Sequence, residues 1–102
     1  MKMFKLFLIA AALFLFSCQS KEEKTAQGAV DRYIVFVDSV NKAKYERRRE
    51  RWDFIEEEHH RKRKDAEEAL SKFKEKDREK QRRRIAERDE KYEGIKASVE
   101  KQ

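Results

Sequence analysis

The sequence lacks the residues that usually end helices. The chain of 102 residues contains no proline and only two glycines, while 47% of its residues are charged. Between Ala29 and Glu93 helix-forming residues dominate, and no helix breaker interrupts them. A sheet-rich fold needs turn residues and β-branched runs, which this composition does not supply. We therefore predict an all-α fold of elongated, charged helices, arranged either as a helical hairpin or as three helices.

A first helix is expected over residues 29–43, just after Gly28. Residues 33–37 also have the composition of a short buried strand, but no other segment offers a strand partner. Asp31 suits the first turn of a helix because a carboxylate there is favoured by the helix dipole. The helix is preferred because Val30, Ile34, Val37 and Asn41 recur at helical spacing, and Tyr33 and Val40 widen the same stripe.

The segment that follows is also expected to be helical, with a turn between Phe73 and Ile85, where the apolar pattern is interrupted. Ser71 and Asp77 are the candidate caps near that turn. Acid–base pairs at i, i+4 stabilise a helix by about 0.2–0.5 kcal/mol each. Five such pairs are present: Glu57–Arg61, Glu58–Lys62, Glu68–Lys72, Glu79–Arg83 and Glu87–Lys91. The apolar seam runs through Trp52, Ile55, His59, Ala66, Leu70 and Phe73, and then through Ile85, Arg88, Tyr92, Ile95 and Val99.

The N-terminal segment has the parts of a secretory signal peptide. Lys2 and Lys5 precede an apolar run over residues 6–16, after which the chain becomes polar. The run is shorter than the ~20 apolar residues that a membrane-spanning helix needs. Leu15, Phe16 and Ser17 stand directly before the single cysteine, Cys18. This order resembles a bacterial lipobox, in which the cysteine sulfur receives a diacylglycerol and the signal is cut just before it.

Cys18 can also be interpreted as a small, inert thiol in an apolar helix. It has no second cysteine for an intramolecular disulfide and no clustered histidines for a metal site. Its position at the end of a signal favours lipidation, and several acyl chains make an effectively permanent anchor. We expect a signal peptide at residues 1–17, a lipidated cysteine with a polar tether at residues 18–27, and a helical domain at residues 28–102.

Residues of the expected tether carry a second resemblance. Lys21, Glu22 and Glu23 follow Cys18 closely and are similar to the export signal of Bacteroidota surface lipoproteins. A charged tether without any signal is the alternative. Ser20 and Glu23 have capping-box spacing, but no apolar periodicity follows directly, so a disordered or frayed tether is expected. The resemblance implies an outer-membrane protein that is exposed at the cell surface.

The whole arrangement resembles a family of small, uncharacterised Bacteroidota lipoproteins with a domain of unknown function. The shared features are the lipobox, a short helix such as residues 33–40, a Trp-x-x-Ile segment at Trp52 and Ile55, and a last helix with Ile85 followed by Tyr92. This chain has more arginine and fewer loop residues than that pattern. The family has no established activity, so the resemblance implies none for this chain.

Glu56, His59 and His60 are the nearest approach to a chemical site. Their order differs from the His-Glu-x-x-His of zinc proteases, in which two histidines share one helix face. We interpret them as a solvated histidine pair, with weak metal binding as the alternative. No nucleophile with a base and an orienting partner is recognisable, and no glycine-rich phosphate loop is present. The sequence therefore predicts neither an enzyme nor a cofactor.

Arginine clusters are the candidate anion-binding residues. From Cys18 onward 25 basic and 21 acidic residues remain, since Lys2 and Lys5 leave with the signal. The excess is small and dispersed, which argues against nucleic acid as a partner. The clusters are Arg47, Arg48 and Arg49 (with Arg51), Arg61 and Arg63 (with Lys62 and Lys64), and Arg82, Arg83 and Arg84. They are interpreted either as an ion-paired, solvated surface or as a site for anionic envelope ligands.

Two functions follow from these features. The first is a lipid-anchored, non-enzymatic envelope protein that acts through helix association, with a helical protein partner or a second copy of itself. The second is a binder of lipopolysaccharide, cell-wall polymer or anionic lipid through the arginine clusters. The apolar residues are few for a chain of this length, which favours a marginal helical domain completed by a partner.

Overall fold

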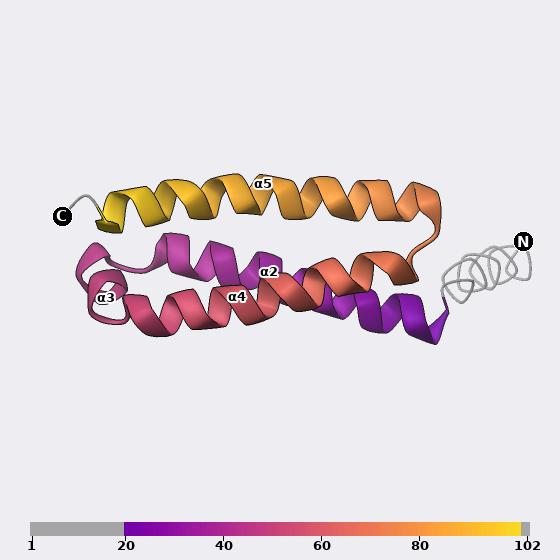
Figure 1. Cartoon of the computed structure of the whole chain (residues 1–102), viewed down its shortest axis with the longest axis horizontal. Helices are drawn as coiled ribbons and strands as arrows, with labels where there is room; N and C mark the ends of the chain where they lie inside the picture. Colours follow the sequence, from indigo (N-terminus) through magenta and orange to yellow (C-terminus); the bar gives the residue numbers. More distant parts are fainter. Residues whose placement is uncertain (1–19, 101–102) are drawn as a thin grey trace, which may run out of the picture.

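The structure is a computed structural model that describes residues 20–100, and these residues form helices and no strand. Three long helices run side by side (Figure 1): α2 (Lys21–Lys42), α4 (Trp52–Ala69) and α5 (Glu75–Glu100). A short helix α3 (Tyr45–Glu50) and a 3₁₀ turn η1 (Leu70–Lys72) lie in the connections. The predicted all-α fold is confirmed, and the arrangement is the three-helix one.

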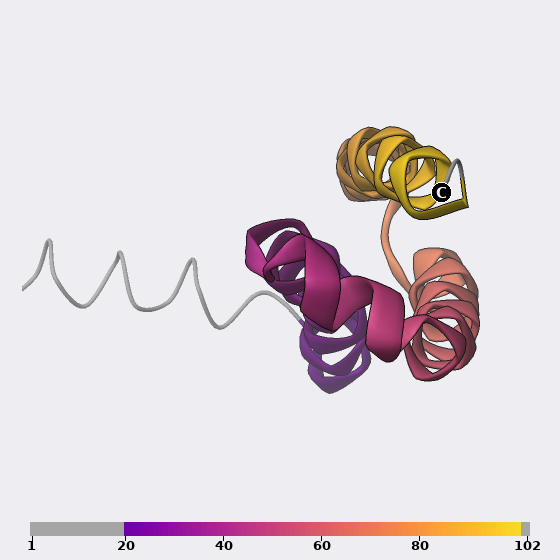
Figure 2. The ribbon, with the colours of Figure 1, turned by 90° about the vertical axis from the view of Figure 1, so that its left-hand side faces the viewer.

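The helices form an open triangle when viewed along their axes (Figure 2). α4 runs antiparallel to α2 and α5, so the start of α2, the end of α4 and the start of α5 share one end of the bundle. α3 and the end of α5 share the other end. Figure 2 also shows that α5 covers one side of the α2–α4 pair and leaves the other side open.

Core residues follow an alternating spacing of three and four positions on each long helix. This spacing is that of helices that pack as a coiled coil. The buried residues at this spacing are Glu23, Ala26, Val30, Tyr33, Val37 and Val40 on α2, and Gln81, Ile85, Tyr92, Ile95 and Val99 on α5. From α4 and the turn after it, Ala66, Ala69 and Phe73 are buried, and Trp52, Ile55 and Leu70 are partly buried against the core.

The predicted turn after Phe73 is confirmed, and it is stabilised by an arginine. Phe73 is extended and buried, and α5 begins two residues later. The guanidinium of Arg78 donates to the carbonyl oxygens of Leu70 and Phe73, both at 3.0 Å. Ser71 bonds back to the carbonyl of Glu68 rather than capping the next helix. The chain therefore turns where Arg78 satisfies the carbonyls left at the end of the preceding helix.

The expected tether at residues 18–27 is wrong from residue 21 onward, because α2 begins at Lys21 and not near residue 29. The hydroxyl oxygen of Ser20 accepts a hydrogen bond of 3.1 Å from the backbone N–H of Glu23, which is an N-cap. Glu23 and Ala26 are only 7% and 4% exposed. They continue the spacing of the core residues, but a glutamate and an alanine are not recognised as core residues from a hydrophobicity pattern. Gly28 consequently lies inside α2, and the domain starts at residue 20 rather than 28.

Candidate functional site

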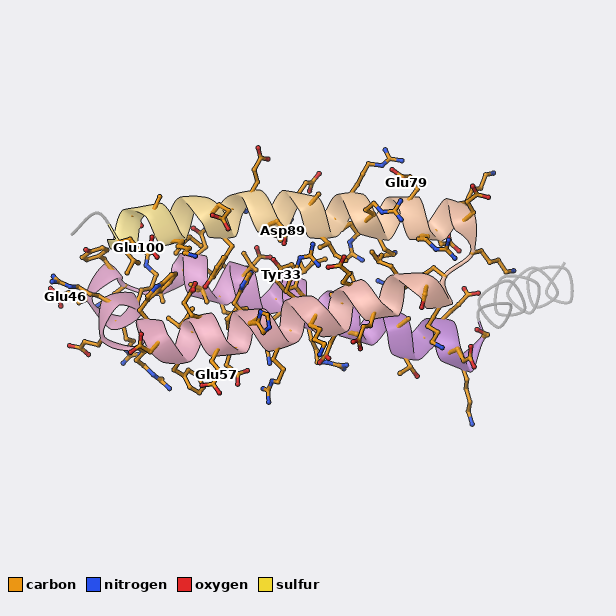
Figure 3. The ribbon with its side chains drawn as sticks, in the orientation of Figure 1. Tyr33, Glu46, Glu57, Glu79, Asp89 and Glu100 are labelled. Atoms are coloured by element: carbon orange, nitrogen blue, oxygen red, sulfur yellow. The ribbon has the colours of Figure 1, made fainter. Side chains whose placement is uncertain are left out.

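Two buried tyrosines join the three helices at the middle of the bundle. Tyr33 of α2 is fully buried and donates its hydroxyl to the carboxylate of Asp89 on α5. Tyr92 of α5 is 2% exposed and donates its hydroxyl to the carboxylate of Glu56 on α4. Tyr33 and Asp89 are labelled in Figure 3, where they face each other across the bundle. Each tyrosine thus binds a half-buried carboxylate of a neighbouring helix.

His59 of α4 lies between the two tyrosines. Its ring stacks on Tyr92 with a centroid separation of 3.5 Å and an interplanar angle of 1°. Its Nε2 lies 3.2 Å from the hydroxyl oxygen of Tyr33. Because the hydroxyl proton of Tyr33 goes to Asp89, a hydrogen bond across this contact requires the tautomer of His59 in which Nε2 carries the proton. Trp52 also stacks on Tyr92, at 5.8 Å.

Cations balance the two carboxylates. The Nε of Arg63 donates to both carboxylate oxygens of Asp89, at 2.8 and 3.1 Å, and its Nη1 donates to Glu67. The Nζ of Lys96 lies 3.7 Å from a carboxylate oxygen of Glu56. We call the residues Tyr33, Glu56, His59, Arg63, Asp89 and Tyr92 the central network.

Burial sets the protonation states of the central network. Burial, and then hydrogen bonding to Asp89 and Glu56 respectively, raises the pKa of Tyr33 and that of Tyr92, so both hydroxyls stay protonated. Burial lowers the pKa of His59, so its imidazole is neutral near pH 7. For Arg63 burial alone would lower the pKa, but the hydrogen bond and charge of Asp89 outweigh it and raise the pKa. The central network therefore connects α2, α4 and α5 through hydrogen bonds between protonated tyrosines, a neutral histidine and ion-paired carboxylates.

The predicted solvated histidine pair is wrong for His59, because its ring packs on Tyr92 in the bundle. His60, one residue further on, is exposed as predicted. The spacing of the apolar seam already placed His59 in line with Trp52 and Ile55, so this signal was present in the sequence. Tyr33 and Tyr92 were expected as core residues, but their pairing with Asp89 and Glu56 depends on helix register and was not. Among residues 20–100 no group of three or more acidic, histidine or cysteine residues is arranged to hold a metal ion.

A second set of polar contacts ties α2 to α5. Arg84 donates to Asp31 at 3.1 Å, and Arg88 donates to Asp38 at 3.0 Å. Gln27 donates to Gln81 at 3.2 Å. These contacts fix the register of two helices that run in the same direction.

The predicted arginine clusters separate into paired and unpaired groups. Four of the eight arginines bond to carboxylates of the bundle: Arg61 to Glu58, Arg63 to Asp89, Arg82 to Glu79 and Arg84 to Asp31. Of the predicted i, i+4 pairs Glu58–Lys62 forms, at 3.0 Å, and it lowers the pKa of Glu58, whereas Glu79 pairs with Arg82 instead of Arg83. Arg47, Arg48 and Arg49 on α3 pair with no carboxylate of residues 20–100, and neither does the exposed Arg83.

The open side of α2 and α4 is hollowed along its length. One hollow of about 560 Å³ lies between the start of α2 and the end of α4. Its lining combines three alanines and a threonine with five charged residues: Ala26, Ala29, Ala69, Thr25, Lys21, Glu22, Arg32, Glu68 and Lys72. A second, of about 380 Å³, includes Val35 and Phe36. A third, of about 180 Å³, lies under α3. None of the three is lined by a residue of α5, so together they form one groove on the side away from α5, which we call the α2–α4 groove. Val35 and Phe54, the two large apolar side chains that are most exposed, both line it (62% and 52% exposed).

Leu15, Phe16, Ser17 and Cys18, with the predicted signal peptide, lie outside the described residues. Within those residues no helix combines the length and apolar character that crossing a membrane requires. A scan against protein-family models finds no match, and comparisons with curated proteins and with solved structures find no similar protein.

Proposed function

We propose that this protein is a lipid-anchored lipoprotein of a bacterial envelope, and that its bundle acts without catalysis through helix association. The anchor would be a lipid on Cys18, after removal of residues 1–17. Support for the association comes from the α2–α4 groove. This groove lies between the antiparallel helices α2 and α4. A further helix would pack into it in the way that α5 packs on the opposite side.

The start of α2 bears on how the bundle is held. Lys21 is the first helical residue and follows Cys18 by three positions. A lipid on Cys18 would therefore hold the end of the bundle that contains the start of α2 directly at the bilayer, without a long linker. We call this end the proximal end, and the end with α3 the distal end.

The proposal includes an outer-membrane location with exposure at the cell surface, in line with the resemblance to Bacteroidota lipoproteins. Lys21 and Glu22 are exposed on the first turn of α2, whereas Glu23 is buried. An export machinery that reads this segment would therefore contact the first two residues. The substitution of Lys21 and Glu22 by alanine should leave the protein in the membrane fraction and protect it from protease added to whole cells. Full protection of the wild-type protein would instead indicate a periplasm-facing anchor.

Binding of anionic envelope ligands is the second candidate, and the arginines of α3 favour it. Arg47, Arg48 and Arg49 are not neutralised within the bundle, so they are available to phosphate or carboxylate groups. Salt separates the two candidates, since charges on an exposed surface are screened over a few Å at about 0.5 M salt. A helix interface should keep most of its bound partner at this concentration, whereas ligands held by phosphate contacts should dissociate.

Cys18→Ala tests the anchor itself. The wild-type protein should appear in the membrane fraction in its processed form, and the variant should accumulate as a precursor that retains residues 1–17. Ser17→Ala is the matched control, because alanine is also a small residue before the cysteine and should allow processing. Equal processing of wild type and Cys18→Ala would contradict a lipid anchor at this residue.

A further inference from the structure

The distal part of the α2–α4 groove is apolar at its floor and basic at its rim. Phe36, Val40 and Ile55 line its floor with Phe54 beside them. The rest of the lining consists of Ser39, Ala43 and three arginines, Arg47, Arg48 and Arg51, and no acidic residue contributes to it. The guanidinium carbon of Arg51 lies 5.0 Å from the centre of the Phe54 ring, and Nε of Arg48 is buried without a hydrogen-bond acceptor among residues 20–100. An occupant of this hollow should therefore be narrow, partly apolar and acidic.

The outer face of α5 has these properties in its second half. Ala86, Glu90 and Ala97 recur there at intervals of four and seven, on the side of the helix opposite Ile85, Tyr92 and Ile95. Gly94 lies on the same face, and a Cβ added to it would meet no atom within 4 Å. Small residues allow a second helix to approach closely. Glu87 and Glu93 flank this line, and both are exposed.

The groove and this face of α5 lie at the same height in the bundle. α3 and the end of α5 both belong to the distal end (Figure 1). They nevertheless face opposite directions, since α5 lies on the far side of the α2–α4 pair (Figure 2). Two copies held by lipids in one membrane, in the same orientation, would therefore present the acidic face of one beside the basic groove of the other.

We propose that the distal α2–α4 groove binds the outer face of α5, from Ala86 to Ala97, of a second copy of this chain. This assignment rests on the proposed lipid anchor, because lipids on Cys18 would hold both copies at the same distance from the membrane. The groove is concave, so a flat membrane surface would not fill it, whereas a helix lying between two helices would. Two grooves facing each other would oppose arginine to arginine, which excludes a symmetric groove-to-groove dimer.

The contact uses two different surfaces, so each copy keeps a free groove and a free α5. Such a head-to-tail contact repeats, and it produces rows or rings rather than closed dimers. Confinement to a membrane raises the effective concentration of the copies, so a modest interface is sufficient. The expected product is a lateral array of bundles on the membrane.

Cysteine cross-linking in membranes of cells that make the full chain tests this contact. The paired variant carries Phe54→Cys and Glu90→Cys. These positions lie on opposite sides of one bundle, so a disulfide between them joins two copies. Oxidation should give a ladder of dimers, trimers and larger species, whereas each single variant should give dimers at most. The matched control pairs Phe54→Cys with Arg83→Cys, seven residues earlier on α5 and about 10 Å lower, which exceeds the Cα separation that a disulfide spans. It should give at least tenfold less ladder.

Gly94→Leu, added to the paired variant, separates assembly from folding. Leucine stabilises a helix relative to glycine and has open space in a single copy, so the bundle should melt no earlier. The ladder should nevertheless fall at least tenfold, because the side chain fills the contact. Glu87→Lys with Glu93→Lys should have the same effect, and adding Arg47→Glu with Arg51→Glu should restore the ladder.

Three results would overturn the proposal: no ladder, an equal ladder from the control pair, or a ladder unchanged by Gly94→Leu. If the arginine changes instead reduce binding of the full chain to vesicles with anionic lipid and leave the ladder unchanged, the groove contacts the membrane and not a second copy. The mass of Cys18 in the same samples reports the anchor separately. Acylated Cys18 without a ladder refutes the array alone, and a ladder with unmodified Cys18 refutes the anchor alone.

Discussion

We expect Tyr33→Phe to lower the free energy of unfolding by about 1.5–2 kcal/mol. The phenyl ring keeps the volume of the buried side chain, so no cavity forms and the change is confined to the hydroxyl. This hydroxyl donates to the carboxylate of Asp89 and accepts from Nε2 of His59. A hydrogen bond to a charged group contributes about 1.5–3 kcal/mol. The lower part of that range applies because Asp89 keeps Arg63 at 2.8 Å.

Thermal and urea unfolding of the chain from Gln19 onward, followed by circular dichroism, measures this change. For a domain of this size 1 kcal/mol corresponds to about 4–8 °C in Tm, so the loss should be about 6–16 °C. Glu57→Gln, at an exposed position labelled in Figure 3, is the control and should change Tm by less than about 2 °C. In an Asp89→Asn background the cost of Tyr33→Phe should fall, because the charged acceptor is gone.

An unchanged urea midpoint and an unchanged transition slope in Tyr33→Phe would mean that the hydroxyl of Tyr33 adds no net stability. In that case the hydrogen bond from the hydroxyl to Asp89 would be no more favourable in free energy than its hydrogen bond to water in the unfolded chain. The central network would then not hold the three helices together.

Two further predictions concern other parts of the bundle. The pKa of His59 is lowered in the folded state from its ordinary value of about 6.5, so the unfolded chain binds more protons at this residue below that pH. The free energy of unfolding should therefore decrease as the pH is lowered from about 6.5, by up to about 1.4 kcal/mol per pH unit. Urea unfolding at pH 7.5 and 5.5 measures this slope, which should flatten in His59→Gln but not in the exposed His60→Gln; equal slopes in all three would contradict it. Ser20→Ala should cost about 1 kcal/mol through loss of the N-cap, with faster amide exchange in the first turn of α2, and unchanged exchange there would mean that this turn is already frayed.

The helices and the turn near Phe73 were predictable because they depend on local properties. Helices in a chain without proline and with two glycines have few residues at which to end. The 3-4 spacing of Ile85, Tyr92, Ile95 and Val99 marks the buried face of α5. Three helices rather than a hairpin follow from packing between distant segments, which composition does not determine.

The start of α2 and the central network were not predictable in the same way. Glu23 and Ala26 are buried because α2 continues along its neighbours, yet neither residue looks like a core residue in a hydrophobicity pattern. The hydrogen bond from Tyr33 to Asp89 joins residues 56 positions apart. Only the relative register of α2 and α5 brings them together. The same applies to the arginines, since pairing or its absence depends on which carboxylate the fold brings near each one.

The most direct test of a lipid-anchored bundle is the intact mass of the protein purified from bacterial membranes. We expect a chain that begins at Cys18, has lost residues 1–17, and carries on Cys18 the added mass of a diacylglycerol, with or without a further acyl chain on its amine. A chain that retains residues 1–17, or one with an unmodified Cys18, would contradict it.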